Sequence, residues 1–331
     1  MKTEERAFDI YAGQRPKVLL LGNGLCRAYG GISWDRLLDE IKDSQYTRSA
    51  SAYIMPMPLK AAMLTNNTLA TKMRGIVRED AAGTRWSSFT RTTPEMREVI
   101  RQAIGKGFDY VLTTNYSYEI EAALLDAPSL RQRQIAALMN HHEVDNAQTQ
   151  YLINTYNQVG EIPVWHIHGE ARKPDSMVIG SFYYGKILRR CVERLDAQKG
   201  EEFKVNFRTG KPQKIGSWVD AFVLGDVSIL GFGLDFSESD IWWLIEYKCN
   251  NPAFCGTTTF YEPDTVSGAT CLNDSRLPCD HAASYVDARQ CRDLLLTQAY
   301  HVKRESCGIV IRDSADYKVF YQKAISALNN A

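Results

Sequence analysis

The chain has 331 residues; 44% are hydrophobic, 24% are charged, and 39 Lys and Arg balance 39 Asp and Glu. This size and composition are typical of one large globular domain, or of a domain with a sizeable insert. A net charge of zero gives no indication of a nucleic-acid partner. Residues 1–14 contain several charges and lack the apolar core of a signal peptide. No apolar run reaches the roughly 18 residues that span a membrane. We therefore expect a cytoplasmic protein that binds neither membranes nor nucleic acid.

Apolar runs that predict strands alternate with stretches that predict helices. The predicted strands are residues 17–21, 110–113, 164–167, 177–180, 227–230, 258–261 and 308–311. The predicted helices are residues 34–45, 58–75, 94–105, 118–140 with a continuation to about residue 158, 238–248 and 315–328. Residues 185–222 are more polar and basic, and we interpret them as a solvated helical insert.

This alternation predicts an α/β fold, a Rossmann-like parallel sheet flanked by helices with a helical insert or subdomain. We expect a single domain over residues 1–331. Its core segments would be about residues 16–32, 106–118, 162–182, 224–264 and 305–330, and its helical inserts about residues 33–105, 119–160 and 185–222.

The eight cysteines do not predict a disulfide framework, because no secretory signal accompanies them. Cys249, Cys255, Cys271 and Cys279 invite a zinc interpretation, but their gaps are wider than the roughly two to four residues of usual zinc pairs. We therefore expect ordinary buried thiols and no bound metal.

In a parallel sheet, ligands bind outside the carboxyl ends of the strands. Gly22-Asn23-Gly24 follows the first strand and precedes a helix, where glycine N–H groups can approach a pyrophosphate. A dehydrogenase fingerprint would have a third glycine at position 27, where this chain has Arg27. A simple tight turn therefore also explains the pattern. Gly231-Phe232-Gly233-Leu234-Asp235 is a second such turn, and two glycine turns in one sheet favour a dinucleotide.

Two other strands end in polar side chains. Thr114-Asn115 has two interpretations. These residues could form a helix N-cap, or the Asn115 side-chain amide could hold a ribose hydroxyl or a water. His166 and His168 lie on a predicted strand, so both imidazoles are expected to point the same way. A metal pair is conceivable, but no third ligand is evident. A core or surface histidine is the ordinary interpretation of each, but His168 at the strand end is well placed as a general base.

Taken in order, these motifs resemble those of the sirtuin-like superfamily over about residues 17–264. The resemblance implies that Asn115 and His168 are catalytic. It implies that NAD, as substrate, is bound by Gly22, Asn23, Gly24, Leu25, Trp34, Thr114, Gly231, Phe232, Gly233, Asp235 and Glu262. The family motif continues from the asparagine to an aspartate that helps recognise nicotinamide; Ser117 stands there, with Glu119 close by.

The TTNY and WHIHG forms of the two motifs look like those of bacterial NAD-cleaving effectors of anti-phage defence. That resemblance implies an NAD+ glycohydrolase that depletes NAD+, controlled by homo-oligomer assembly or by a partner sensor protein. Deacylating sirtuins carry four zinc-binding cysteines between the histidine motif and the later glycine turn, where this chain has only Cys191. We therefore expect no sirtuin-type zinc module. The alternatives are an NAD- or ADP-ribose-binding or scaffolding module without hydrolysis, and an NAD-dependent deacylase.

Overall fold

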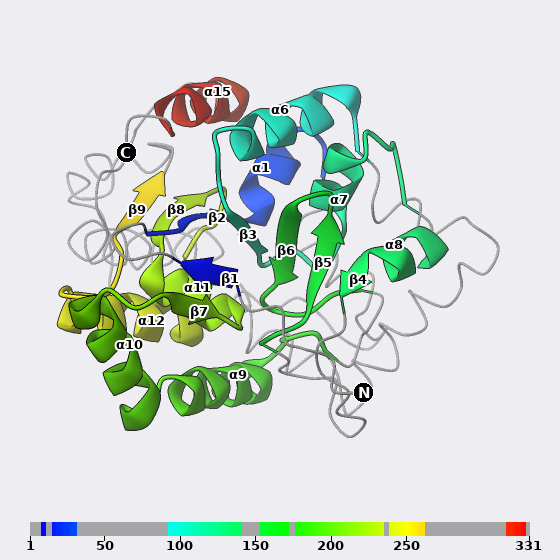
Figure 1. Ribbon diagram of the computed structural model, residues 1–331. Coiled ribbons are helices and arrows are strands. Elements are labelled where there is room, and N and C mark those ends of the chain that lie inside the picture. The colour runs from blue at the N-terminus through cyan, green and yellow to red at the C-terminus, as the bar shows by residue number, and fades with distance from the viewer. Residues whose placement is uncertain are drawn as a thin grey trace, which may run out of the picture.

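The computed structural model describes residues 8–10, 15–31, 92–130, 132–140, 153–171, 176–234, 238–261 and 316–328. Its centre is a seven-stranded sheet in the order β4-β5-β6-β3-β2-β8-β9 (Figure 1). The strands of this sheet are β2 (Lys17–Leu21), β3 (Tyr110–Thr113), β4 (Met139–Asn140), β5 (Tyr156–Val159), β6 (Ile162–His166), β8 (Asp226–Leu230) and β9 (Thr258–Tyr261). The helices are α1 (Asn23–Ala28), α6 (Pro94–Ile104), α7 (Glu119–Leu124), α8 (Gln132–Leu138), α9 (Ser181–Arg194), α10 (Ala197–Thr209), α11 (Trp218–Leu224), α12 (Ser239–Asn250) and α15 (Tyr317–Ala327).

The parallel part of the sheet has Rossmann connectivity. Strands β6, β3, β2, β8 and β9 pair in parallel, whereas β5 and β4 continue the sheet in antiparallel pairing. Counted along the chain, the parallel strands lie in the order 3-2-1-4-5, which is the order of a doubly wound sheet. The predicted α/β fold class is therefore confirmed.

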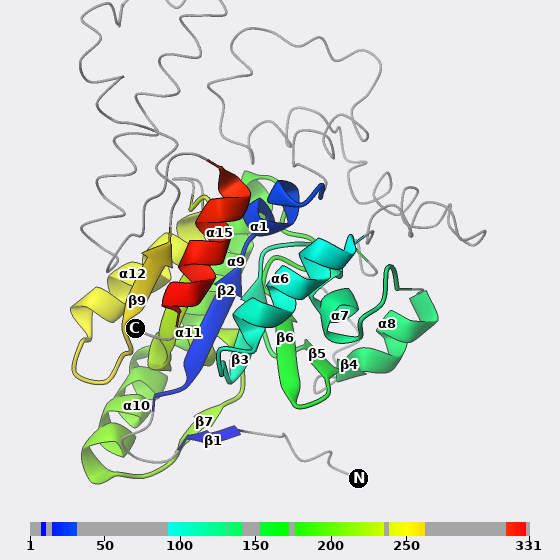
Figure 2. The same ribbon diagram turned by 90° about the horizontal axis from the view of Figure 1, so that it is seen from above.

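Alternate residues of the central strands enter two separate cores, because successive side chains of a strand point to opposite faces. Leu19 and Leu21 of β2 pack with α1, α6, α7 and α15 on one face. Val18 and Leu20 pack with α9, α11 and α12 on the other. Figure 1 shows α6 and α15 above the sheet and α9 to α12 below it, and Figure 2 shows α15 lying beside both α1 and α6.

The direction of the connections reverses between β2 and β8. From β2 the next parallel strand along the chain is β3 on one side, and from β8 it is β9 on the other. The carboxyl ends of β2 and β8 therefore flank the topological switch point, where open α/β sheets leave a crevice for ligands.

Three parts of the predicted secondary structure are wrong. The helical interpretation of residues 119–160 fails at β4 and β5. Polar Asn157 and Gln158 conceal strand β5 in the sequence, and Gly160, at φ +61°, begins the turn to β6. Residues 177–179 are buried but form no strand, because the Val178 backbone is hydrogen-bonded to the Tyr116 hydroxyl and the His168 carbonyl. Within the predicted helical insert, β7 (Gln213–Ile215) pairs antiparallel with β1 (Phe8–Ile10).

The other predicted strands and helices that fall within the described residues are confirmed to within a few residues at their ends. The helices predicted at residues 34–45 and 58–75 and the strand predicted at 308–311 lie outside the described residues. Cys26, Cys191 and Cys255 are buried free thiols as expected, whereas Cys249 is exposed. None of the described helices is both long and apolar enough to cross a bilayer.

A buried ammonium group closes the amino-terminal edge of β8. Lys248 of α12 is 5% exposed, and its Nζ donates to the carbonyl oxygens of Phe222, Gly225 and Thr257 at 2.8 to 3.0 Å. Two of these carbonyls lie in or just beyond the last turn of α11, where carbonyl groups lack partners within the helix and favour a cation.

We predict that Lys248→Met lowers the free energy of unfolding by about 3 kcal/mol, because buried carbonyl groups lose a charged donor. Exposed Lys211→Met is the matched control and should change it by less than about 0.5 kcal/mol. Equal urea midpoints for the two variants would contradict this interpretation of Lys248.

Candidate functional site

The carboxyl ends of β2, β3, β6 and β8 bring most of the predicted site residues to one edge of the sheet. Gly22 to Leu25 follow β2, Thr114 and Asn115 follow β3, His168 follows β6, and Gly231 to Gly233 follow β8. Three other predicted residues, Trp34, Asp235 and Glu262, lie outside the described residues.

The two glycine turns pack directly against each other. The Gly22 N–H donates to the Leu230 carbonyl at 2.9 Å, and the Gly24 N–H donates to the Gly231 carbonyl at 2.6 Å. A Cβ atom at Gly22 would lie 2.4 Å from the Gly231 oxygen, and Gly231 itself has φ +71°. Glycine is therefore required here for close packing of the turns, and these two N–H groups are already used within the protein.

Other residues of the glycine turns contribute differently. The side chains of Leu25 and Phe232 are buried in the two hydrophobic cores, so only their backbone groups can face a ligand. Gly233 is exposed, and a Cβ atom there would meet no atom of the described residues within 4 Å. Leu234 follows at φ +44°, a conformation that side chains rarely adopt and that is often found at functional sites.

Asn115 is held through its backbone, while its side-chain oxygen is left unsatisfied. Thr113 Oγ1 donates to the Leu21 carbonyl at 2.7 Å and accepts from the Asn115 N–H at 3.1 Å. The Asn115 amide nitrogen lies 3.6 Å from Cys26 Sγ. Asn115 Oδ1 is buried without a hydrogen-bond partner among the described residues. The N-cap interpretation does not apply, because α7 begins at Glu119 with Tyr118 as its N-cap.

A buried ion pair fixes the loop that carries Asn115. His166 Nδ1 donates to the Asn115 carbonyl at 2.6 Å, and Nε2 donates to Glu121 Oε1 at 2.8 Å. Asn157 donates to the same Glu121 oxygen at 2.7 Å. Burial alone would lower the pKa of His166, but the Glu121 carboxylate overcomes it and raises the pKa to about 9. His166 is therefore a protonated structural histidine at neutral pH.

The His166 pair predicts a pH-dependent stability. His166 binds its proton more tightly in the folded chain, since its pKa rises from 6.5 to about 9. Its stabilising contribution is complete below about pH 6.5 and is lost as the pH rises through about 9. We predict that the urea midpoint of the wild type falls over this range. His166→Gln should lower the midpoint at about pH 6 and flatten the decline. An unchanged decline in His166→Gln would contradict the assignment.

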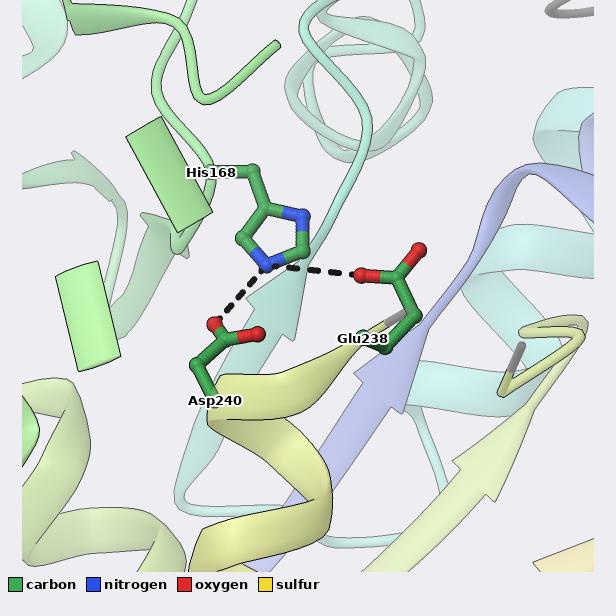
Figure 3. A group of neighbouring side chains, drawn as sticks. All are labelled: His168, Glu238 and Asp240. Atoms are coloured by element: carbon green, nitrogen blue, oxygen red, sulfur yellow. Dashed lines mark hydrogen bonds and ion pairs between the residues drawn. The ribbon is translucent and has the colours of Figure 1, made fainter. Parts of the chain in front are cut away.

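His168 lies in the turn after β6 and contacts a different set of groups. Its Nε2 lies 3.0 Å from Asp240 Oδ2 and 3.8 Å from Glu238 Oε2 (Figure 3). The expectation that both imidazoles share a strand and point to one side is therefore wrong, because β6 ends at His166. Burial alone would lower the pKa of His168, but the Asp240 and Glu238 carboxylates hold it above the ordinary value of 6.5.

Backbone and side-chain hydrogen bonds link the Asn115 and His168 segments. The Tyr116 hydroxyl donates to the Val178 carbonyl at 2.8 Å, and the Val178 N–H donates to the His168 carbonyl at 2.7 Å. Gly169 has φ +88°, and a Cβ atom there would lie 2.1 Å from the Ser176 oxygen. The glycine after His168 is thus required by the backbone, and the network fixes the two strand ends relative to each other.

Glu119 opens α7, in the segment that follows Asn115. The Ser117 hydroxyl donates to Glu119 Oε2 at 2.5 Å, and Glu119 is buried. Burial raises the pKa of Glu119 to about 7, against the opposing effect of the Ser117 hydrogen bond. The Glu119 charge also acts on the thiol of Cys26, whose pKa is raised first by burial and then by Glu119. Cys26, which contacts the Asn115 amide, is therefore also within the electrostatic influence of the Ser117–Glu119 pair.

The site residues that the sequence did not predict are all acidic: Glu121, Glu238 and Asp240. Glu238 and Asp240 precede and open α12, where acidic residues are common because they favour a helix N-terminus. Because this role is common, the two residues do not stand out in the sequence. Their position just beyond the second glycine turn could have marked them as candidate site residues.

The same three groups could hold a metal ion. His168, Glu238 and Asp240 each offer one ligand atom, and these atoms lie within 4.8 Å of one another. Three protein ligands and an open position are typical of catalytic zinc. However, His168 and Asp240 already lie at hydrogen-bond distance, so the pair is explained without an ion.

Comparison of the chain with protein-family models gives no match, and comparison with curated proteins also gives none. The geometry of the strand ends and the order of the sequence motifs are therefore the features of the chain that bear on its function.

Proposed function

We propose that the chain is an NAD+ glycohydrolase, which cleaves NAD+ to nicotinamide and ADP-ribose with Asn115 and His168. The observation that carries the proposal is the Asn115 amide. Its oxygen is buried without a described partner, at the carboxyl end of a strand beside the switch point. Buried polar groups are nearly always hydrogen-bonded, so an unsatisfied amide oxygen here is an acceptor available to a ligand hydroxyl or water.

Three features favour NAD as the substrate. The 3-2-1-4-5 strand order is that of dinucleotide-binding sheets, and the glycine turns lie at its switch point. Among the described residues, none lies within 4 Å of the point where a Cβ of Gly233 would project, which leaves room for a ligand to approach its backbone. The ordered motifs also resemble those of sirtuin-like NAD-cleaving effectors. A strand order alone does not establish a function, so the proposal also requires the reacting groups.

The reaction requires few groups. Cleavage of the nicotinamide–ribose bond expels a neutral leaving group from a cation, so no general acid is needed. The transition state resembles an oxocarbenium ion, as in glycoside hydrolysis. Asn115 would orient the ribose hydroxyl or the attacking water, and His168 would accept its proton. Buried Glu119, which accepts a hydrogen bond from Ser117, would face the nicotinamide side of the sugar in place of the aspartate that Ser117 replaces.

Unrestrained hydrolysis of NAD+ would harm the cell that makes the enzyme. We therefore propose a defence role in which activity is controlled by homo-oligomer assembly or by a partner that senses infection. A steep rise of specific activity with protein concentration would support control by assembly. A specific activity independent of concentration would favour a separate sensor protein.

The test is to measure NAD binding and nicotinamide release on the same preparation of the full chain, at several protein concentrations. Many nicotinamide molecules released per chain, without added peptide, are expected for the hydrolase. Binding of NAD without release would select the binding or scaffolding module. Release only in the presence of an acylated peptide would select the deacylase.

A further inference from the structure

We propose that Asp240 is the positioning residue of His168: it holds the imidazole with its proton on Nε2 and thereby leaves Nδ1 as the basic nitrogen that faces substrate. The role of Nδ1 as a base rests on the proposed hydrolase function. The orientation and tautomer of His168 do not, and they can be measured in the protein alone.

The geometry of the pair supports this role. Asp240 Oδ2 lies 3.0 Å from His168 Nε2, and the two residues are 0% and 1% exposed. Asp240 Oδ2 can only accept when ionised, so Nε2 must carry the hydrogen. Figure 3 shows Nδ1 on the side of the ring away from Asp240. No described residue forms a hydrogen bond with Nδ1.

Asp240 is fixed more firmly than its neighbour Glu238. It lies in the first turn of α12, a helix that packs against α9 and the central strands. Glu238 precedes the helix, is partly exposed, and lies 3.8 Å from Nε2. Tyr184 of α9 shares a hydrogen bond with Glu238 and packs its ring edge-on to His168 at 5.2 Å. The direct orienting contact therefore comes from Asp240.

The surroundings determine how the pair titrates. The charged or titratable groups that face it are Glu238 on the same segment, Tyr184 and Cys191 from α9, and Tyr116 from the loop after β3. Burial raises the pKa of each of these phenols and of the Cys191 thiol, so they stay neutral near pH 7. The two carboxylates are then the anions that act on His168.

This arrangement links the strength of the base to its orientation. An imidazole that donates one N–H to a buried carboxylate is held in one tautomer and becomes more basic at the other nitrogen. Removing the Asp240 charge while keeping its shape should therefore lower the pKa of His168 and mix its tautomers. A purely structural role of Asp240 in starting α12 would move neither quantity.

The experiment is a pH titration of the full chain labelled with 15N-histidine, with His168→Gln used to assign the His168 signals. We expect neutral His168 to be the Nε2–H tautomer, with a titration midpoint above 6.5. Asp240→Asn should lower the midpoint by about one unit or more and mix the tautomers. Glu246→Gln removes an exposed carboxylate from the same helix and should change neither. An unchanged His166 signal reports that each variant is folded.

Kinetics then test the consequence for catalysis. Asp240→Asn should lower kcat for nicotinamide release by about 100-fold with little change in KM, and should move the acidic limb of the pH profile to lower pH. Asp240→Glu, which restores the charge, should recover part of the loss. If the His168 titrations of the variants are as expected but the wild type releases no nicotinamide, the inference about Asp240 holds and the hydrolase function is rejected.

Three results would overturn the inference. One is an Nδ1–H tautomer in the wild type. The second is an Asp240→Asn variant that is folded and has unaltered His168 signals. The third is stoichiometric Zn2+ that is retained by the wild type, is lost in Asp240→Asn, and perturbs the His168 nitrogens, since the three groups would then be metal ligands.

Discussion

Asn115→Ala is expected to lower the rate of nicotinamide release by about 1,000-fold while leaving the fold as stable as the wild type, or slightly more stable. Loss of one positioned polar group that acts in the transition state has an effect of this order. Stability should not fall, because Asn115 Oδ1 has no described partner and the amide nitrogen makes only a long contact with Cys26. Removing an unsatisfied buried oxygen relieves a desolvation cost.

Asn157→Ala is the matched contrast for the stability measurement. Asn157 is also a buried asparagine, but its amide donates to Glu121 at 2.7 Å. Its removal leaves a buried carboxylate with one hydrogen bond fewer, so we expect a loss of about 2 kcal/mol. If Asn115→Ala is as destabilised as Asn157→Ala, or retains wild-type turnover, the proposed role of Asn115 is wrong.

His168→Gln is expected to lower turnover by about 100-fold to 10,000-fold, the usual effect of removing a general base. Gln keeps an N–H donor that can reach Asp240, so the fold should persist. His168→Ala would be a poorer test, because it leaves the fully buried Asp240 carboxylate without its partner. Breaking a buried pair in this way costs about 3 to 5 kcal/mol.

The pH profile gives the sign of the His168 effect. His168 must be neutral to accept a proton, and its pKa is held above 6.5 by the Asp240 and Glu238 carboxylates against the effect of burial. Wild-type turnover should therefore rise with pH through a midpoint above 6.5, and His168→Gln should lose this limb. A profile that is flat between pH 6 and about 9 in the wild type would argue against His168 as the base.

The sequence predicted the parts of the fold that depend on local patterns. Apolar runs such as residues 17–21 and 227–230 are buried on both faces of the sheet, and glycine or polar residues mark their ends. Since parallel strands end at one edge, the sequence alone assigns Asn115, His168 and both glycine turns to that edge.

The sequence could not predict what depends on contacts between distant segments. Glu121 appears as an ordinary residue of a short helix, yet it is fully buried and pairs with His166 from 45 residues further along the chain. The run at residues 177–180 has the composition of a strand, but Tyr116 and His168 use the Val178 backbone groups that a strand would offer its neighbour. Such competition is decided by packing and not by composition.

The glycine turns show a similar limit. Their sequence is equally compatible with a phosphate-binding loop and with two turns in close contact, and the structure shows the close contact. We propose that the remaining backbone groups of these turns bind the diphosphate of NAD. Measurement of NAD binding to the full chain tests this.

NAD+ hydrolysis is tested most directly by the number of nicotinamide molecules that the purified chain releases from NAD+, measured over a range of protein concentrations beside Asn115→Ala. We predict many turnovers per wild-type chain, equal amounts of nicotinamide and ADP-ribose, and almost none from Asn115→Ala. NAD binding without nicotinamide release at every concentration would exclude the hydrolase, and equal release by the wild type and Asn115→Ala would exclude a catalytic role for Asn115.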